Sequence, residues 1–317
     1  MKRGQTAIIG AGVAGLACAR RLQDAGWPVT VFEKSRGLGG RLATRRTPQG
    51  LTFDHGAPFI RVTEKAPDLE RQLTGTGDAV IWPTATEHQY VGVPSMNAWL
   101  KPMAEGIPLR LHTRVIGIAA THDQWQLTLE ADNAAATSET FDTIICTVPA
   151  PQAQELTGHL AGFSGVFDRI RMTPCWTLMV AFEERLNLPF DFQEHPDTGI
   201  AKLIRNTAKP GRPQDHDCWV VQADAAWSTD NLELEKEEAA ARLLAKFADV
   251  AGIPLPAVTY QTAHRWRYAL TASAYGVPFL PHPDGSLYLG GDWLLEDTVS
   301  DGWRSGNAIA DALLQTD

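Results

Sequence analysis

The strongest constraint on the fold lies near the N-terminus, where a short apolar segment at 7–9 runs into a glycine-rich turn at 10–15. An amphipathic segment at 16–25 follows, and a second apolar segment, Val29–Phe32, ends on the acidic residue Glu33. A G-x-G-x-x-G turn between a strand and a helix, with an acid after the next strand, is typical of a dinucleotide-binding βαβ unit. The sequence therefore predicts that this chain binds a dinucleotide.

Each residue of this unit has a physical reason. Gly10 permits the tight turn, Gly12 lets the backbone approach a pyrophosphate, and Gly15 lets the helix pack closely on the strand. Ala14 lies at the helix N-terminus, whose unpaired N–H groups and positive dipole end attract phosphates. Glu33 is placed to accept hydrogen bonds from an adenosine ribose. We predict that these five residues form part of a cofactor site.

Composition limits the partners of the chain. The 317 residues, 44% hydrophobic and 21% charged, fit a soluble globular protein of one large domain or two ordinary ones. A net charge of −9 argues against nucleic acid or an anionic membrane as partner. No segment after the N-terminus is long and apolar enough to span a bilayer. We expect small-molecule partners, while the oligomeric state is left open.

The N-terminal segment superficially resembles an export signal, with Lys2 and Arg3 before an apolar stretch. The dinucleotide turn accounts for the glycines that interrupt this stretch, so we expect a cytoplasmic protein. The cysteines lie far apart and form no C-x-x-C pair, which favours buried thiols over a disulfide framework or a metal site. They are Cys18, Cys146, Cys175 and Cys218.

The later segments predict an α/β chain with two interleaved domains. An apolar strand at 141–148 is typical of a buried parallel sheet, and 109–118 alternates as a strand with a hairpin partner at 125–129. Further strands are expected at 175–182, 201–206, 219–223 and 258–266, with a helix at 235–251. We predict a discontinuous cofactor domain of residues 1–60, 105–155 and 283–317. An inserted α+β substrate domain, built on a mixed sheet, would comprise residues 61–104 and 156–282.

A second motif near the C-terminus favours FAD over NAD. A strand-like segment at 287–290 is followed by Gly291 and Asp292, a carboxylate that suits a ribityl chain or a pyrophosphate. An NAD-binding Rossmann domain normally closes its site within one contiguous unit. The final helix opens with a dipole that could face the pyrimidine edge of a flavin, at Asp301, Gly302 and Trp303. The expected fold is a Rossmann-like FAD-binding domain of the GR2, or p-hydroxybenzoate hydroxylase, type.

A basic glycine-rich loop follows the second strand and extends the predicted cofactor site. Lys34 begins the loop, and Gly40 would bring the backbone close to the pyrophosphate, with Arg41 as its charge partner. Arg45 and Arg46 are equally compatible with a solvated basic loop and with a functional role. The backbone of Val115 is expected to lie against the adenine.

Six motifs, in order over nearly the whole chain, carry a resemblance to a known family. They are EKSRGLGGR at 33–41, DHGA at 54–57, VGVPSM at 91–96, TVPAPQ at 147–152, AHRWRY at 263–268 and GDW at 291–293. Together they resemble the renalase branch of the amine-oxidase-like flavoproteins, and its bacterial members most closely. The resemblance implies that Gly56, Ala57 and Pro58 lie near the flavin.

The resemblance also implies an activity. Such an enzyme is a non-covalent FAD oxidase that takes a hydride from aberrant 2- or 6-dihydro isomers of NAD(P)H, releases NAD(P)+, and passes the electrons to oxygen to give hydrogen peroxide. No cysteine or histidine neighbours Asp292 to form a covalent flavin link. The chain departs from the family pattern at 58–61, near the flavin. It is also unusually acidic after Asp292, at Glu296, Asp297 and Asp301.

Hydride transfer from a dihydropyridine needs no catalytic base, so the protein must stack the ring, exclude water and orient the substrate. Three residues would share one face of an extended segment and are candidates for this wall: His264, Trp266 and Tyr268. Trp293 is a fourth candidate. Each of the four is about as compatible with plain packing. Arg265 and Arg267 would point to the opposite face and pair with surface acids.

Three other functions remain open from sequence. An amine oxidase or desaturase of the same superfamily would need an apolar tunnel or a membrane-docking segment, and no such apolar stretch is evident. A flavin-binding redox sensor without turnover would explain the departure at 58–61. An NAD-dependent dehydrogenase is disfavoured by the C-terminal Gly-Asp motif.

Overall fold

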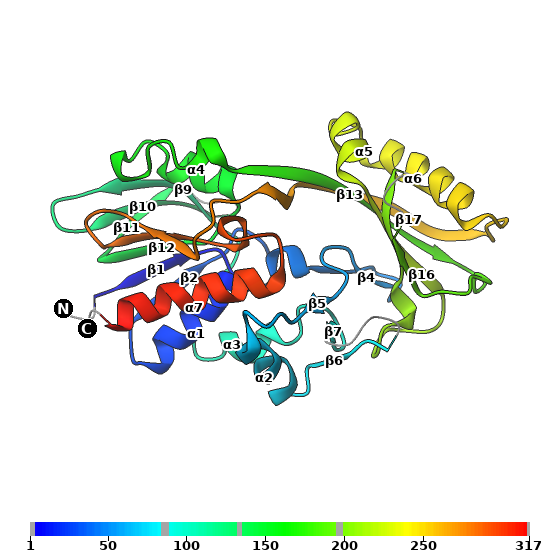
Figure 1. Ribbon diagram of the computed structural model, residues 1–317, viewed down its shortest axis with the longest axis horizontal. Helices are drawn as coiled ribbons and strands as arrows, with labels where there is room; N and C mark the ends of the chain where they lie inside the picture. The colour runs from blue at the N-terminus through cyan, green and yellow to red at the C-terminus, as the bar shows by residue number, and fades with distance from the viewer. Residues whose placement is uncertain (1–3, 84–88, 132–134, 195–198, 316–317) are drawn as a thin grey trace.

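The computed structural model describes residues 4–83, 89–131, 135–194 and 199–315. In the view of Figure 1 the two termini lie together at one end, and the antiparallel strands β13 (Arg171–Phe182) and β17 (Val258–Ser273) link the middle of the molecule to the other end. Within the described residues, no helix combines the length and apolar character that crossing a bilayer would require. The four cysteines are buried free thiols, as predicted.

The dinucleotide unit forms the centre of a six-stranded sheet, in the order β18-β19-β12-β1-β2-β8. All its pairs are parallel except β18 with β19. The strands are β1 (Thr6–Ile9), β2 (Val29–Phe32), β8 (Leu109–Arg110), β12 (Thr143–Cys146), β18 (Phe279–Pro281) and β19 (Leu287–Gly290). They come from separated stretches of chain, which makes this sheet discontinuous in sequence. β18 precedes the predicted domain boundary at 283.

The two faces of this sheet have separate cores, because side chains alternate along each strand. Ile8 packs with α1 (Val13–Asp24) and α7 (Val299–Gln315), which lie side by side in Figure 1. Ala7 and Ile9 face the opposite way and pack with a three-stranded antiparallel sheet and α4 (Ala150–Thr157). That sheet consists of β9 (Thr113–Ala120), β10 (Trp125–Ala131) and β11 (Thr137–Phe141).

Two predicted strands are each divided between sheets. The segment at 109–118 breaks at His112, whose φ of +51° is left-handed, so β8 joins the parallel sheet and β9 the hairpin. The segment at 141–148 begins inside β11 and contributes only β12 to the parallel sheet. Periodicity could not reveal either break, because both halves are extended and apolar on one side.

The inserted part is built on a five-stranded sheet of order β14-β15-β16-β13-β17. Its pairs are all antiparallel, whereas a mixed sheet was predicted. Its remaining strands are β14 (Phe192–Glu194), β15 (Ile200–Arg205) and β16 (Asp217–Ala223). Helices α5 (Ala225–Asp230) and α6 (Lys236–Ala251) pack on one face, which leaves the other face for the cofactor domain. The α/β class and the Rossmann-like FAD-binding domain are confirmed.

Smaller elements connect the two parts. They are a hairpin of β3 (Thr44–Arg46) and β4 (Thr52–Asp54), the sheet of β5 (Ile60–Arg61), β6 (Ala79–Ile81) and β7 (Gln89–Gly92), and the helices α2 (Pro67–Gly75) and α3 (Leu100–Ala104). Short 3-10 helices occupy Gly40–Leu42, Ala161–Phe163, Phe167–Arg169, Asn206–Ala208 and Asp292–Leu294.

A buried ionic cluster links the hairpin to the inserted sheet. Asp54 at the end of β4 accepts hydrogen bonds from Lys209 (3.1 Å) and Arg212 (2.6 Å), and all three side chains are inaccessible to solvent. Burial alone would raise the pKa of Asp54, but Lys209 and Arg212 hold it well below its usual range. Burial lowers the pKa of Lys209 to about 8 despite the neighbouring carboxylate. The cluster therefore fixes how the segment after β4 meets the inserted sheet.

Candidate active site

A cavity of about 1430 Å³ lies where four parallel strands end. Gly10, Glu33, Thr147 and Gly291 directly follow β1, β2, β12 and β19, and all four line the cavity. The carboxyl ends of the strands are the usual ligand position in an open α/β sheet. The volume exceeds the roughly 300–1,000 Å³ of an ordinary small-molecule pocket. It therefore has room for a dinucleotide and for part of a second molecule.

The glycine turn has the geometry that its sequence predicts. Gly10 has a φ of +104°, and a Cβ on Gly15 would lie 2.0 Å from the Gly10 carbonyl oxygen. A Cβ on Gly12 would meet no atom within 4 Å, because it would point into open space. Gly12 precedes α1 and, with Ala14, lines the cavity, whereas Gly15 only packs the helix on the strand. The amides of the first helical turn have no partner within the helix.

Glu33 is 7% exposed and lines the cavity, as Lys34 and Val115 do. Its carboxylate accepts a hydrogen bond from the Ala11 amide (2.9 Å) and another from the Ser35 amide (2.8 Å). A carboxylate has about four acceptor positions, so Glu33 can accept these two backbone hydrogen bonds and still accept one from a ligand hydroxyl. Sequence reasoning predicted the ligand contact but not these backbone contacts.

We expect Glu33→Ala to purify with less FAD and to bind added FAD about tenfold or more weakly, since hydrogen bonds to a charged group are strong ones. Flavin absorbance per chain and a titration of the flavin-free protein measure this. Glu130→Ala, at an exposed position on β10, is the matched control. Unchanged flavin content in Glu33→Ala would contradict the ribose assignment.

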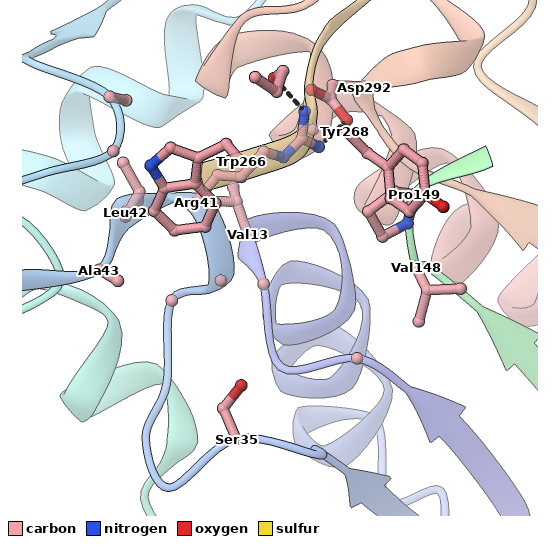
Figure 2. A pocket seen from close by; sticks show the side chains of 18 of the residues that line it. Val13, Ser35, Arg41, Leu42, Ala43, Val148, Pro149, Trp266, Tyr268 and Asp292 are labelled. Carbon is pink, nitrogen blue, oxygen red and sulfur yellow. Dashed lines mark hydrogen bonds and ion pairs between the residues drawn. The ribbon is translucent and has the colours of Figure 1, made fainter. Parts of the chain in front are cut away.

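Arg41 and Asp292 meet across 251 positions of sequence, and Figure 2 shows their contact. The guanidinium donates to Asp292 Oδ1 (2.5 Å) and to the Ala269 carbonyl oxygen (3.0 Å). Each residue was predicted as a separate cofactor contact, and the structure places both in the cavity lining as an ion pair. Their pairing joins the N-terminal loop to the C-terminal motif around one cavity.

Two further glycines keep the backbone of this region close together. A Cβ on Gly40 would lie 3.7 Å from the Gly12 Cα, and one on Gly56 would lie 1.9 Å from the Arg41 carbonyl oxygen. Ala57 donates its amide to that same oxygen (2.9 Å), and Gln222 Nε2 donates to the Gly56 carbonyl oxygen (2.6 Å). Gly40, Gly56, Ala57 and Pro58 all line the cavity.

One wall of the cavity is aromatic. Trp266 and Tyr268 project from β17 on either side of Arg41 in Figure 2, and His264 lines the cavity from the same strand. The ring centroids of His264 and Trp266 lie 4.4 Å apart. The three candidates from β17 are therefore brought together at the cavity.

His55 completes this wall and was missed as a wall residue by sequence reasoning. Its ring lies 4.9 Å from His264 and 5.2 Å from Trp266, and its carbonyl oxygen accepts a hydrogen bond from Trp266 Nε1 (2.8 Å). Burial, followed by the charge of His264, lowers the pKa of His55 to about 4. Burial and then Arg45 lower the pKa of His264 to about 4. Both imidazoles are neutral at neutral pH. The DHGA motif was the available signal.

Besides Gly15, three predicted site residues lie outside the cavity lining. Trp293 is fully buried, and its Nε1 donates to the Val148 carbonyl oxygen, so it packs in the core instead of forming a substrate wall. Trp303 Nε1 donates to Asp68, and Asp301 bonds to Thr298 and Arg304. Only Gly302 of the predicted helix-opening residues reaches the cavity.

The surface charges near the site are also resolved. Arg265 and Arg267 both pair with the exposed Glu233, which confirms the predicted surface pairing. Both also line the cavity, so the expectation that they point away from the site is wrong. Of the acidic residues after Asp292, Asp297 lines the cavity. Glu296 forms an exposed ion pair with Lys65 instead, with 3.7 Å between Glu296 Oε1 and Lys65 Nζ.

Comparison with known proteins gives the family. The sequence profile of "Flavin containing amine oxidoreductase" matches residues 66–314, more than half of the chain. The chain belongs to the flavin-containing amine oxidoreductase family. A profile of an "NAD(P)-binding Rossmann-like domain" matches residues 8–74, which contain the glycine turn.

Individual relatives are distant. Two strains of Staphylococcus aureus, Newman and USA300, have a "4,4'-diapophytoene desaturase (4,4'-diaponeurosporene-forming)" that is 41% identical over 63 residues. That match spans 20% of this chain and only 12% of the desaturase. A solved structure described as "Putative protoporphyrinogen oxidase from Exiguobacterium sp. 255-15" aligns over 100% of both chains, with a TM-score of 0.72 at 13% identity. At that identity the likeness supports the fold alone.

The residues present fit the flavin that this family carries. Gly12 leaves open space beside the free amides of the first turn of α1, where a pyrophosphate would be held. Glu33 and Val115 line one part of the cavity, and Arg41, Asp292 and the aromatic wall line another. A bound FAD supplies a two-electron acceptor, which dioxygen can re-oxidise.

Proposed function

We propose that this protein is an oxidase of the renalase type, which oxidises 2- or 6-dihydro isomers of NAD(P)H with non-covalently bound FAD. The overall reaction consumes the dihydronicotinamide, one proton and dioxygen, and it yields NAD(P)+ and hydrogen peroxide. The FAD is proposed to be non-covalent because Cys175, the cysteine in the cavity lining, is held as a thiol. Burial raises its pKa to about 11, and its Sγ donates to the Ala223 carbonyl oxygen.

The aromatic wall with its neutral imidazoles is the observation that carries this proposal. His264 and Trp266 offer flat, mostly apolar surfaces on which a dihydropyridine ring could rest and exclude water. The pKa of His264 is shifted by burial and by Arg45 and by no carboxylate. Such a wall suits a neutral ring better than the protonated amine of an amine oxidase substrate, which would be repelled by Arg45.

The role of the chain is to position the ring. His55 accepts the Trp266 Nε1 hydrogen bond through its carbonyl oxygen and stacks on the indole, so the two rings hold each other. Because hydride loss from a dihydropyridine leaves an aromatic cation without deprotonation, neither imidazole needs to act as a base. Their neutral state matches that requirement.

Anaerobic stopped-flow mixing tests the proposal. The purified yellow protein is mixed with 2- and 6-dihydroNAD(P), with ordinary 4-dihydroNAD(P)H and with a panel of amines, and flavin bleaching is followed. We expect rapid bleaching by the 2- or 6-dihydro isomers and hydrogen peroxide once air is admitted. Bleaching by amines alone would refute the proposal. A yellow protein that none of these compounds bleaches would instead favour the redox-sensor alternative.

A further inference from the structure

Arg45 is a cation in the cavity without a counter-ion. It lies on β3, is half-buried, and lines the cavity. Among the described residues, no hydrogen bond from its guanidinium and no ion pair is found. The adjacent Arg46 donates to Ser95 Oγ (3.1 Å). The unused donors of a half-buried guanidinium can bind an anion that enters the cavity and displaces water.

The other half-buried guanidinium groups of the cavity lining have carboxylate partners: Arg41 pairs with Asp292, and Arg265 pairs with Glu233. Arg36, Arg61 and Arg114 also line the cavity, but they are exposed and therefore solvated by water. Asp54 is not free to serve Arg45 as well, because its carboxylate already accepts from Thr44, the Met96 amide, Lys209 and Arg212. Arg45 is therefore left for a ligand.

The position of Arg45 relates that ligand to the aromatic wall. Arg45 lies opposite Phe53 in the β3–β4 hairpin, and His55, whose ring contacts His264 and Trp266, follows Phe53 by two positions. Arg45 and these rings line the same cavity, and beyond the effect of burial the charge of Arg45 helps to lower the pKa of both imidazoles. An anion on Arg45 would therefore sit beside the wall, within one molecule's reach of a ring resting on Trp266.

Lys202 is the competing cation. It lines the cavity from β15. Across the sheet it is paired with Gln222 of β16, which is paired with Thr177 of β13, which in turn is paired with His264 of β17. Three strand spacings, about 14 Å, separate its backbone from that of His264. Glu194 lies opposite Lys202 in the β14–β15 register, and Glu194 and Asp297 line the cavity with it, so two carboxylates compete with a ligand phosphate for Lys202.

We propose that Arg45 binds a phosphate group of the substrate while the substrate's planar ring rests on His264 and Trp266. This assignment rests on the proposed function and deepens it, because it names the residue that would bind a phosphate of the dihydronicotinamide dinucleotide. Arginine suits the role because its planar fork donates two parallel hydrogen bonds to a phosphate.

The test varies the side chain at position 45 and, separately, the presence of a phosphate on the substrate. Wild type, Arg45→Met and Arg45→Lys, each checked for equal flavin content, are mixed anaerobically with the active dihydronicotinamide dinucleotide. They are also mixed with the matching riboside, which has no phosphate. Arg71→Met is the control, since Arg71 is exposed on α2 and outside the cavity lining. The apparent Kd for flavin reduction is measured separately from the limiting rate.

We expect Arg45→Met to weaken dinucleotide binding about tenfold or more, with partial recovery in Arg45→Lys and the riboside changed less than about twofold. An equal loss for both substrates, or no loss for either, would overturn the assignment. If no isomer bleaches the wild type, the proposed function fails, and titration of the yellow protein with inorganic pyrophosphate then decides the site. If pyrophosphate perturbs the flavin spectrum of the wild type but not that of Arg45→Met, the assignment of Arg45 as a phosphate-binding residue is supported. If it perturbs neither spectrum, or both equally, the assignment is overturned.

Discussion

Replacing Asp54 by alanine should lower the free energy of unfolding by about 3–5 kcal/mol, because it leaves buried cations without their carboxylate. Lys209 can shed its proton, since burial already lowers its pKa to about 8, but Arg212 cannot. The guanidinium would keep only its hydrogen bonds to the Gly92 and Pro210 carbonyl oxygens. Urea unfolding of the flavin-free protein measures the loss directly.

The control for Asp54 is Glu233→Ala, because that carboxylate also binds two cations but lies at the surface. Exposed pairs are screened by water, so we expect no clear change in the unfolding midpoint. If Asp54→Ala unfolds at the same urea concentration as Glu233→Ala, the buried cluster does not hold the two parts together.

Replacing Gly12 by valine should yield a folded but colourless protein. The backbone at Gly12, with φ −80° and ψ −173°, is open to any residue, and a Cβ there meets no protein atom within 4 Å. The added isopropyl group would instead occupy the space beside the free amides of α1, where the pyrophosphate is expected. Circular dichroism and thermal unfolding report the fold, and flavin absorbance per chain reports the site.

Substitutions at two other glycines serve as controls for Gly12→Val. Gly15→Val should disrupt the fold itself, because its Cβ would lie 2.0 Å from the Gly10 carbonyl oxygen. Gly75→Ala, at the end of α2 with nothing within 4 Å, should keep both fold and flavin. A Gly12→Val protein that retains its full flavin content would exclude this turn as the pyrophosphate seat.

The local part of the structure could be predicted from sequence because local rules govern it. The βαβ unit follows from side-chain periodicity and from the few backbone conformations that glycine alone adopts easily. The same rules predicted that His264, Trp266 and Tyr268 share one face of an extended strand, and all three line the cavity. They could not place Trp293, because an indole next to a cavity-lining carboxylate can turn into the core at little cost.

The tertiary structure alone decided which distant residues meet. Sequence determined that the chain carries a dinucleotide unit and a second motif near its other end. Only the fold paired Arg41 with Asp292, stacked His55 on Trp266, and placed Arg45 in the cavity with no counter-ion among the described residues. These contacts join positions up to 251 residues apart. Their partners are chosen by the packing of whole sheets, whereas a turn or a helix is chosen by its own few residues.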